Sequence, residues 1–323
     1  MLKISYKIKI GSTTLTEGKE THLLDISTHS SLNIPANSCY LTLGSPKNLT
    51  ITPDDPISIE LGYEKKTTLV FTGKVNTINW EINQVKIEGV SSLENAIATH
   101  FNSLYEKSSA GDIVQDILKQ GKLKANQVEN GITLSSYALG DTISAYEHLQ
   151  QLAQKCGCDI YANTEDKIVF AKYKPSTTHE FKYGEDILFL SSQQPSAGIG
   201  KVEIYGESPA SQGQGEKAAY WLTKKEVKGT AGDDSGMTLR LVEPIAKTQA
   251  IAQKIAQGIL ANLHEKPGGK MKVIGNAEVK LGDGVKISKM PITQQNGTFK
   301  ITGVSHILND HRGFCTIINW EEP

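Results

Sequence analysis

Apolar and polar residues alternate in short runs along much of the chain, the pattern of β-strands that bury one face. The runs 1–10, 57–62 and 299–304 alternate in this way. Turn-forming residues separate such runs, for example Pro53–Pro56, because proline and aspartate favour tight turns. The pattern therefore predicts a mainly β fold built from many short strands.

The sequence pattern of one predicted hairpin occurs twice. Its first copy spans Phe71–Gly89 and its second spans Phe299–Trp320, and Thr302 matches Thr72 at an offset of 230 (302 − 72). Because repeated supersecondary units leave such periodic matches, the sequence predicts an internal duplication.

The match extends upstream of both hairpins. A polar turn containing Asp55 precedes the first copy, and one containing Asp283 precedes the second, at an offset of 228 (283 − 55). Short strands at this spacing suggest a barrel or sandwich. We therefore expect two similar β-barrel domains, one at each end of the chain.

The middle of the chain predicts helices. Capping boxes begin at Ser109 and Ser144, and Gly121 and Gly157 end the apolar stripes that follow them. A later apolar stripe predicts a helix over 248–264. The resulting fold class is mainly β with α/β insertions, divided into 1–97 (first β-barrel), 98–174 (α/β domain with two helices and a hairpin), 175–205 with 270–323 (second β-barrel), and 206–269 (inserted loop-and-helix domain).

Composition narrows the function. The chain has 323 residues and a net charge of −1, without the basic excess of a protein that binds nucleic-acid phosphates. No signal peptide or membrane helix is predicted, so we expect the chain to be made in the cytoplasm without membrane insertion. The four cysteines predict free thiols in a reducing compartment, and the C-x-C spacing of Cys156 and Cys158 lacks the form of a zinc or redox motif.

The strongest candidate for chemistry is Ser305, His306, Asp310 and His311. In a hydrolase, Ser305 would be the nucleophile, either histidine the base and Asp310 its orienter. Neighbouring residues of a strand point to opposite faces, which argues against this arrangement. We therefore expect no catalytic, cofactor-binding or metal-binding residues and no enzymatic activity.

Weaker candidates have simpler interpretations. We interpret His148 as a packing or surface residue and two acidic pairs as solvated turns. A Gly-x-Gly sequence lacks the third glycine of a dinucleotide site and is predicted to be a loop. The acidic pairs are Asp54-Asp55 and Asp233-Asp234, and the Gly-x-Gly sequence is Gly213-Gln214-Gly215.

The order of several segments resembles the phage late control D family. The segments are 35–43, 54–63, 70–75 and 146–157. Members of this family are baseplate hubs of contractile phage tails and related extracellular contractile injection systems, and type VI secretion spikes carry a similar hub half.

The resemblance implies a structural function. Two barrels with the fold of the tail-tube subunit would form, in a homotrimer, a pseudo-hexameric ring. Such a ring would be a symmetry adaptor between a six-fold inner tube protein ring and a three-fold spike. Because the chain stops at Pro323, we expect the spike to be a separate protein, with other baseplate components as further partners. The resemblance also implies assembly in the cytoplasm of a prokaryotic host and a final place in a phage tail or injection particle.

Two alternatives remain open at this stage. One is a cell-wall or polysaccharide hydrolase of a tail tip that uses the aspartate and histidines of the last hairpin. The other is a stand-alone carbohydrate-binding β protein, which would be monomeric.

Overall fold

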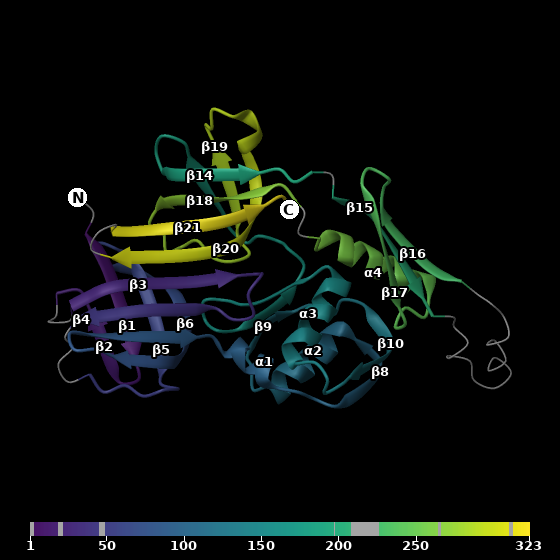
Figure 1. The fold of residues 1–323 in the computed structure, drawn as a ribbon, viewed down its shortest axis with the longest axis horizontal. Helices are drawn as coiled ribbons and strands as arrows, with labels where there is room; N and C mark the ends of the chain where they lie inside the picture. Colours follow the sequence, from purple (N-terminus) through teal and green to yellow (C-terminus); the bar gives the residue numbers. More distant parts are fainter. Residues whose placement is uncertain are drawn as a thin grey trace.

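The structure is a computed structural model, and it is built mostly from β-strands (Figure 1). It describes residues 3–18, 22–44, 49–196, 198–207, 226–263, 266–309 and 313–323. Within these residues no helix is long and apolar enough to cross a membrane.

The first β unit comprises seven strands, paired in the order β2-β1-β5-β6-β7-β4-β3. The alternation read from the sequence is real, because Ile57, Ile59 and Leu61 of β5 are buried. The bounds are β1 (Ile4–Ile10), β2 (Thr13–Thr16), β3 (His22–Ser31), β4 (Ser38–Gly44), β5 (Pro56–Tyr63), β6 (Lys66–Trp80) and β7 (Gln84–Val90).

The second β unit comprises six strands, paired in the order β13-β19-β20-β21-β18-β14. Its own core includes Val285, Ile301, Ile318 and Trp320. The bounds are β13 (Thr178–Lys182), β14 (Ile187–Gln193), β18 (Gly268–Ile274), β19 (Gly284–Ser288), β20 (Gly297–Asn309) and β21 (Gly313–Glu321), with a short 3-10 helix at Thr293–Gln295.

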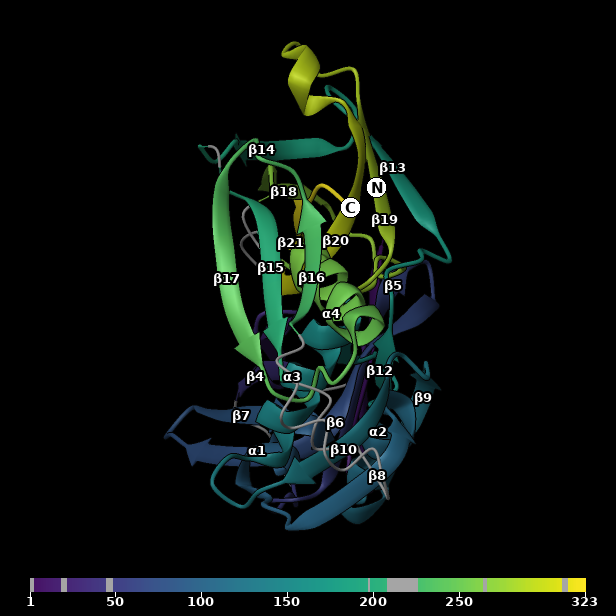
Figure 2. The ribbon, with the colours of Figure 1, turned by 90° about the vertical axis from the view of Figure 1, so that its right-hand side faces the viewer.

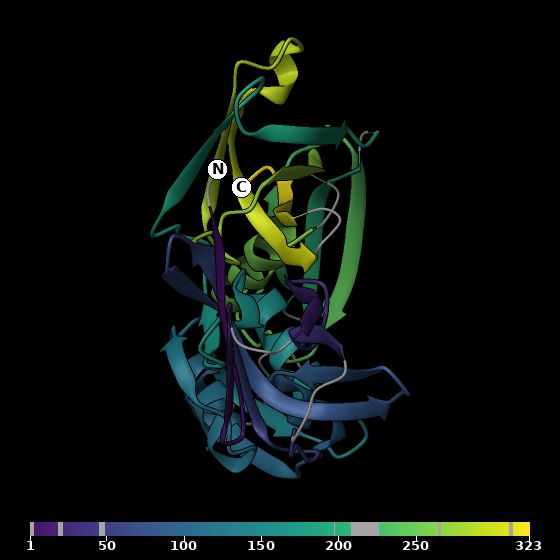
Figure 3. The same cartoon turned by 90° about the vertical axis from the view of Figure 1, so that its left-hand side faces the viewer.

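The two units are not closed barrels, so that prediction was wrong. The outer edge of β3 pairs antiparallel with the second half of β20, and the 13 strands form one continuous sheet. Figures 1 and 3 show the first unit, in purple and blue, beside the yellow strands of the second. Leu308 and Phe314 of the second unit pack into the buried cluster of the first, and the edge of β3 that does not pair with β4 pairs with β20 instead of closing the first unit into a barrel.

The order of strands is the same in both units when β1, β5, β6, β7, β4 and β3 are set against β13, β19, β20, β21, β18 and β14. Bulges occupy matching places. Leu24 of β3 and Leu188 of β14 are each skipped in the pairing with the next strand. Asn76 of β6 and Thr302 of β20 are skipped in the same way. The units differ at one edge, because β1 is antiparallel to β5 whereas β13 is parallel to β19.

The turns before β5 and β19 also match. Asp54 and Gly282 both have positive φ, 68° and 84°. The carboxylates of Asp55 and Asp283 each accept a hydrogen bond from the backbone N–H three residues earlier, at 2.8 and 3.2 Å. The offset of 228 read from the sequence therefore sets equivalent turn residues together.

The hairpin offset needs correction. Lys74 pairs with the first residue of β5 and Lys300 with the first residue of β19, so the pairing sets these lysines together at an offset of 226 (300 − 74). Thr302 then corresponds to Asn76 and not to Thr72. The match at 230 was four residues out of register, since strands of alternating composition match at several offsets.

An α/β region follows the first unit. Ser109 and Ser144 form the predicted capping boxes, and Gly157 ends its helix in the left-handed conformation. The elements are a 3-10 helix (Ser92–Glu94), α1 (Asn95–Ala98), β8 (Ser103–Ser109), α2 (Ala110–Gln120), β9 (Ala125–Val128), β10 (Thr133–Leu139), α3 (Ala145–Cys156), β11 (Asp159–Ala162) and β12 (Ile168–Ala171).

The insertion begins earlier than expected. β15 (Ile199–Gly206), which we assigned to the second barrel, pairs with β16 (Val227–Gly232) and β17 (Met237–Glu243) in a separate sheet. The helix α4 (Gln249–Ala261) packs on β15 and β16 (Figure 2). A single buried cluster contains residues of this insertion and of the α/β region, so the two share a core.

Candidate functional site

The last hairpin does not bring its candidate residues together. His306 is 3% exposed, and its Nδ1 lies 3.1 Å from Thr316 Oγ1 on β21. Ser305 Oγ instead lies 2.7 Å from Nδ1 of His29 on β3. Asp310 and His311 lie outside the described residues. Ser305 and His306 thus contact different residues on different strands. This agrees with the sequence, because neighbouring residues of a strand point to opposite faces.

Burial controls the protonation of His306. Desolvation lowers its pKa from 6.5 to about 4, although a hydrogen bond with the Val279 backbone acts in the opposite direction. The imidazole is therefore neutral at physiological pH and buried, in contact with Thr316 of the paired strand.

This burial makes stability depend on pH. The unfolded chain binds a proton at His306 below pH 6.5, whereas the folded chain does so only near pH 4, so stability falls as the pH drops through this window. On acidification from pH 7 to pH 4, the shifted pKa of His306 should lower the free energy of unfolding by about 3 kcal/mol. Urea unfolding of the wild type and of His306→Gln at both pH values checks this. The variant should lose about 3 kcal/mol less on acidification, and equal losses would contradict the assignment.

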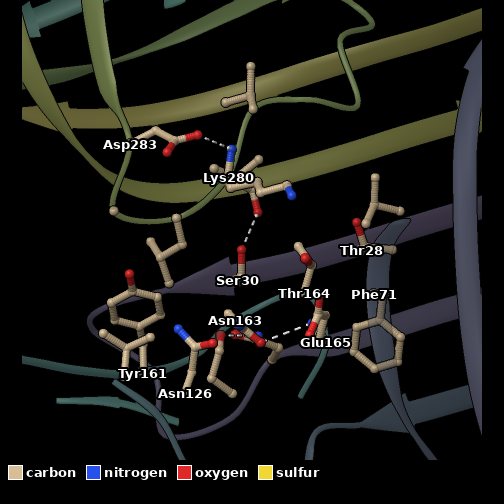
Figure 4. A pocket seen from close by; sticks show the side chains of 18 of the residues that line it. Thr28, Ser30, Phe71, Asn126, Tyr161, Asn163, Thr164, Glu165, Lys280 and Asp283 are labelled. Atoms are coloured by element: carbon tan, nitrogen blue, oxygen red, sulfur yellow. Dashed lines mark hydrogen bonds between the residues drawn. The ribbon is translucent and has the colours of Figure 1, made fainter. Parts of the chain in front are cut away.

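A cavity of about 250 Å³ lies where the two β units meet the β11–β12 hairpin. Figure 4 shows Ser30 of β3, Asn163 of the hairpin turn and Asp283 around it. Ser30 donates to the Val304 carbonyl (3.4 Å), while Asn163 Oδ1 accepts from the Glu165 backbone (3.0 Å). Ser30 and Asn163 already form hydrogen bonds with nearby backbone. We therefore interpret this cavity as a gap left where three parts of the fold pack together.

Two buried polar contacts join elements of different regions, and one of them includes Asp283 of the cavity wall. Lys300 of β20 lies 2.7 Å from Asp159 of β11 and 3.8 Å from Glu321 of β21. His179 of β13 lies 2.9 Å from Asp283. The side chains of Lys300 and Asp159 are only 9% and 12% exposed. The Lys300 pair therefore ties the second β unit to the α/β region through a desolvated charge contact.

The weaker candidates are engaged locally. His148 is buried and contacts Tyr137 Oη (3.1 Å) and the Gly140 carbonyl (3.0 Å). The acidic pairs contact neighbouring groups, for example Asp234 with Lys201 at 3.0 Å. Residues 213–215 lie outside the described part of the chain.

The thiols give no sign of reactivity. All four cysteines are buried and free, and burial raises the pKa of Cys39 and of Cys158 to about 12. Among the described residues, no three side chains of the types His, Cys, Asp or Glu are placed to hold a metal ion.

Comparison with known families identifies the group to which the sequence belongs. The family model described as the Alg8 N-terminal domain matches residues 4–310. The chain belongs to this family. The match covers the first β unit, the segments between the two units and the second β unit up to β20, and it ends before β21. Membership of the late control D family remains a prediction.

Solved structures share the fold at low sequence identity. The 43 kDa tail protein of prophage MuSo2 from Shewanella oneidensis is 14% identical, with a TM-score of 0.74 over 99% of each chain. A tail protein from Neisseria meningitidis MC58 is 15% identical, with a TM-score of 0.74 over 99% of this chain and 97% of that one.

A third structure is the E. coli c3393 protein, a component of the type VI secretion system. It is 12% identical, with a TM-score of 0.59 over 98% of this chain and 77% of that one. The search of curated proteins returned no match. This member of the Alg8 N-terminal domain family therefore has the fold of tail proteins.

Proposed function

We propose that the chain is a structural hub of a phage tail or contractile injection machine. Three chains form a ring of six β units, which seats on a six-fold inner tube on one side and meets a three-fold spike on the other. The two units descend from one duplicated β unit of the tail-tube kind, so a homotrimer imitates six-fold symmetry.

The observation that carries this proposal is the agreement between the two β units. They share a strand order, two bulge positions and the hydrogen-bonded turn before β5 and β19. Bulges and positive-φ turns are specific features of a chain path. Their agreement in two segments supports descent from one unit.

The comparisons with solved structures support a role in a phage tail or injection machine. Two similar structures are tail proteins, and a third is a type VI secretion component described as similar to the T4 tail proteins gp27 and gp5. Further similar chains come from a Francisella PdpA–VgrG complex. We propose an inner tube ring, a separate spike protein and other baseplate components as partners. Assembly would take place in the cytoplasm of a prokaryotic host.

We also propose that the chain is not an enzyme, which disfavours a tail-tip hydrolase. The burial of His306 supports this, because a general base must reach the proton of a substrate or nucleophile. The separate partners of Ser305 and His306 support it further.

Sedimentation equilibrium tests the proposal. Across a concentration series up to the limit of solubility, we expect the mass to approach three times that of one chain. A stable dimer or tetramer would contradict the hub, and so would a monomer at every concentration. A monomer would instead favour the carbohydrate-binding alternative.

A further inference from the structure

The inserted sheet of β15, β16 and β17 has one covered edge and one open edge. At the outer edge of β16, the side-chain amide of Gln253 on α4 donates to the Thr230 carbonyl at 2.6 Å and accepts from the Thr230 N–H at 3.0 Å. β17 pairs with β15 along one side only. In the part of the chain that the structure describes, no group forms a hydrogen bond with the backbone of residues 238–242 on the other side. Such an edge is the kind of surface that accepts a further strand.

Apolar side chains of β17 lack full cover on both faces. Leu239 and Leu241 lie beside Val202 and Ile204, which are fully buried. The helix α4 packs on β15 and β16, away from β17 (Figure 2), and both leucines remain half-buried. On the opposite face Val242 is 75% exposed. A strand beside β17 would therefore cover apolar surface on both faces of the sheet.

The face of the sheet away from α4 is positively charged. Arg240 Nε lies 2.9 Å from the Glu203 carboxylate, and Lys228 Nζ lies 3.2 Å from it. Lys201 lies 3.9 Å from the same carboxylate and 3.0 Å from Asp234. Three cations thus meet two carboxylates, and the Arg240 side chain, which belongs to the open strand, is 65% exposed. An acidic side chain opposite Arg240 on an added strand would be favoured by its charge.

We propose that β17 accepts an extended segment of another protein of the particle, which adds a fourth strand to this sheet. The segment alternates apolar residues, which pack beside Leu239 and Leu241, with acidic residues, which lie beside Arg240. This inference rests on the proposed hub for the source of the segment. The β17 strand of a second copy fits poorly, because antiparallel pairing centred on Arg240 would place two arginines opposite each other.

A synthetic peptide tests the proposal on the full-length chain. The probe has seven residues, the length of β17, and alternates valine with glutamate. When it binds, hydrogen–deuterium exchange should slow at the amides of residues 237–243, because an added strand forms hydrogen bonds with the open edge. A peptide that alternates valine with lysine is the control. It should neither bind nor slow this exchange, since Arg240 repels its charge.

A charge at position 242 should change the affinity in a direction set by its sign. Val242→Lys should tighten binding of the glutamate peptide about two- to fivefold, and Val242→Glu should weaken it by a similar factor, the range for exposed charge pairs. Because Val242 is 75% exposed, both variants should fold. Leu104→Lys and Leu104→Glu, at a 68% exposed position on β8, are the matched controls and should leave the affinity unchanged. Fluorescence anisotropy of the labelled peptide measures each affinity.

The docking edge would be overturned by the absence of saturable binding, by equal binding of the lysine peptide, or by binding that leaves exchange at residues 237–243 unchanged. An affinity that does not respond to charge at position 242 would overturn it too. Exchange at residues 237–243 that slows with protein concentration in the absence of peptide would also overturn it, because a second copy would then occupy the edge.

The outcomes separate this inference from the hub itself. A trimer in sedimentation equilibrium that does not bind the peptide would remove the docking edge and leave the hub standing. A monomer that binds the peptide as expected would support the docking edge and contradict the hub.

Discussion

Replacing Gly258 by Ala is expected to destabilise the chain by about 2–3 kcal/mol, the usual cost of overpacking. Gly258 of α4 rests on the end of α3, where an added Cβ would lie 2.7 Å from the Gly157 backbone nitrogen and also against the Lys155 carbonyl. These are backbone atoms, so they cannot swing aside as a side chain would. Urea unfolding of the variant and the wild type measures the difference.

The expected sign makes this test specific. In an exposed helix the same change would stabilise by about 1 kcal/mol, because alanine favours the helix over glycine. Gly140→Ala is the matched control, since the nearest atom to its added Cβ is Thr142 Oγ1 at 3.7 Å. A neutral or stabilising Gly258→Ala would contradict the close contact of the two helices and the shared core.

Replacing Lys300 by Met is expected to cost about 3–5 kcal/mol, the penalty for removing one partner of a buried ion pair. The change leaves Asp159 and Glu321, 12% and 17% exposed, without their cation. Because Lys300 joins β20 to β11, the second β unit should also separate more easily from the α/β region. Urea unfolding and proteolysis at native conditions measure the two effects.

A second substitution isolates the charge. Asp159→Asn added to Lys300→Met removes one of the stranded carboxylates, so it should restore part of the lost stability. Lys86→Met, which breaks a half-exposed pair with Glu81, should change stability far less. Equal effects of Lys86→Met and Lys300→Met would contradict the importance of burial for the Lys300–Asp159 ion pair.

Local features were predictable from the sequence. The capping boxes at Ser109 and Ser144 and the turns at Asp55 and Asp283 formed as expected. Each depends on residues within a few positions of one another, so short-range chemistry decides it.

Long-range pairing was not predictable. The apolar and polar residues of β15 alternate in the same way whichever sheet the strand joins. Its assignment to the second unit was therefore wrong, because it pairs with β16 and β17. The β3·β20 contact joins residues such as His29 and Ser305, which lie 276 positions apart, and it replaces barrel closure. Gly258 lies inside the helix predicted over 248–264, and no sequence signal there marks the approach of a second helix.

The open strand edges were also not predictable from the sequence. Trp80 and Phe189 lie in ordinary strand patterns, and only the pairing of the strands shows that each lies on an edge with no neighbouring strand among the described residues. The sequence nevertheless marked two matching turns, since the carboxylates of Asp55 and Asp283 each accept a hydrogen bond from the backbone three residues earlier.

Averaged electron-microscope images of the particle, viewed along its axis, give the most direct test. Our account predicts a closed ring with three-fold symmetry that carries six similar β lobes around a central opening. An open assembly, a two-fold particle, or three lobes without matching partners between them would contradict it.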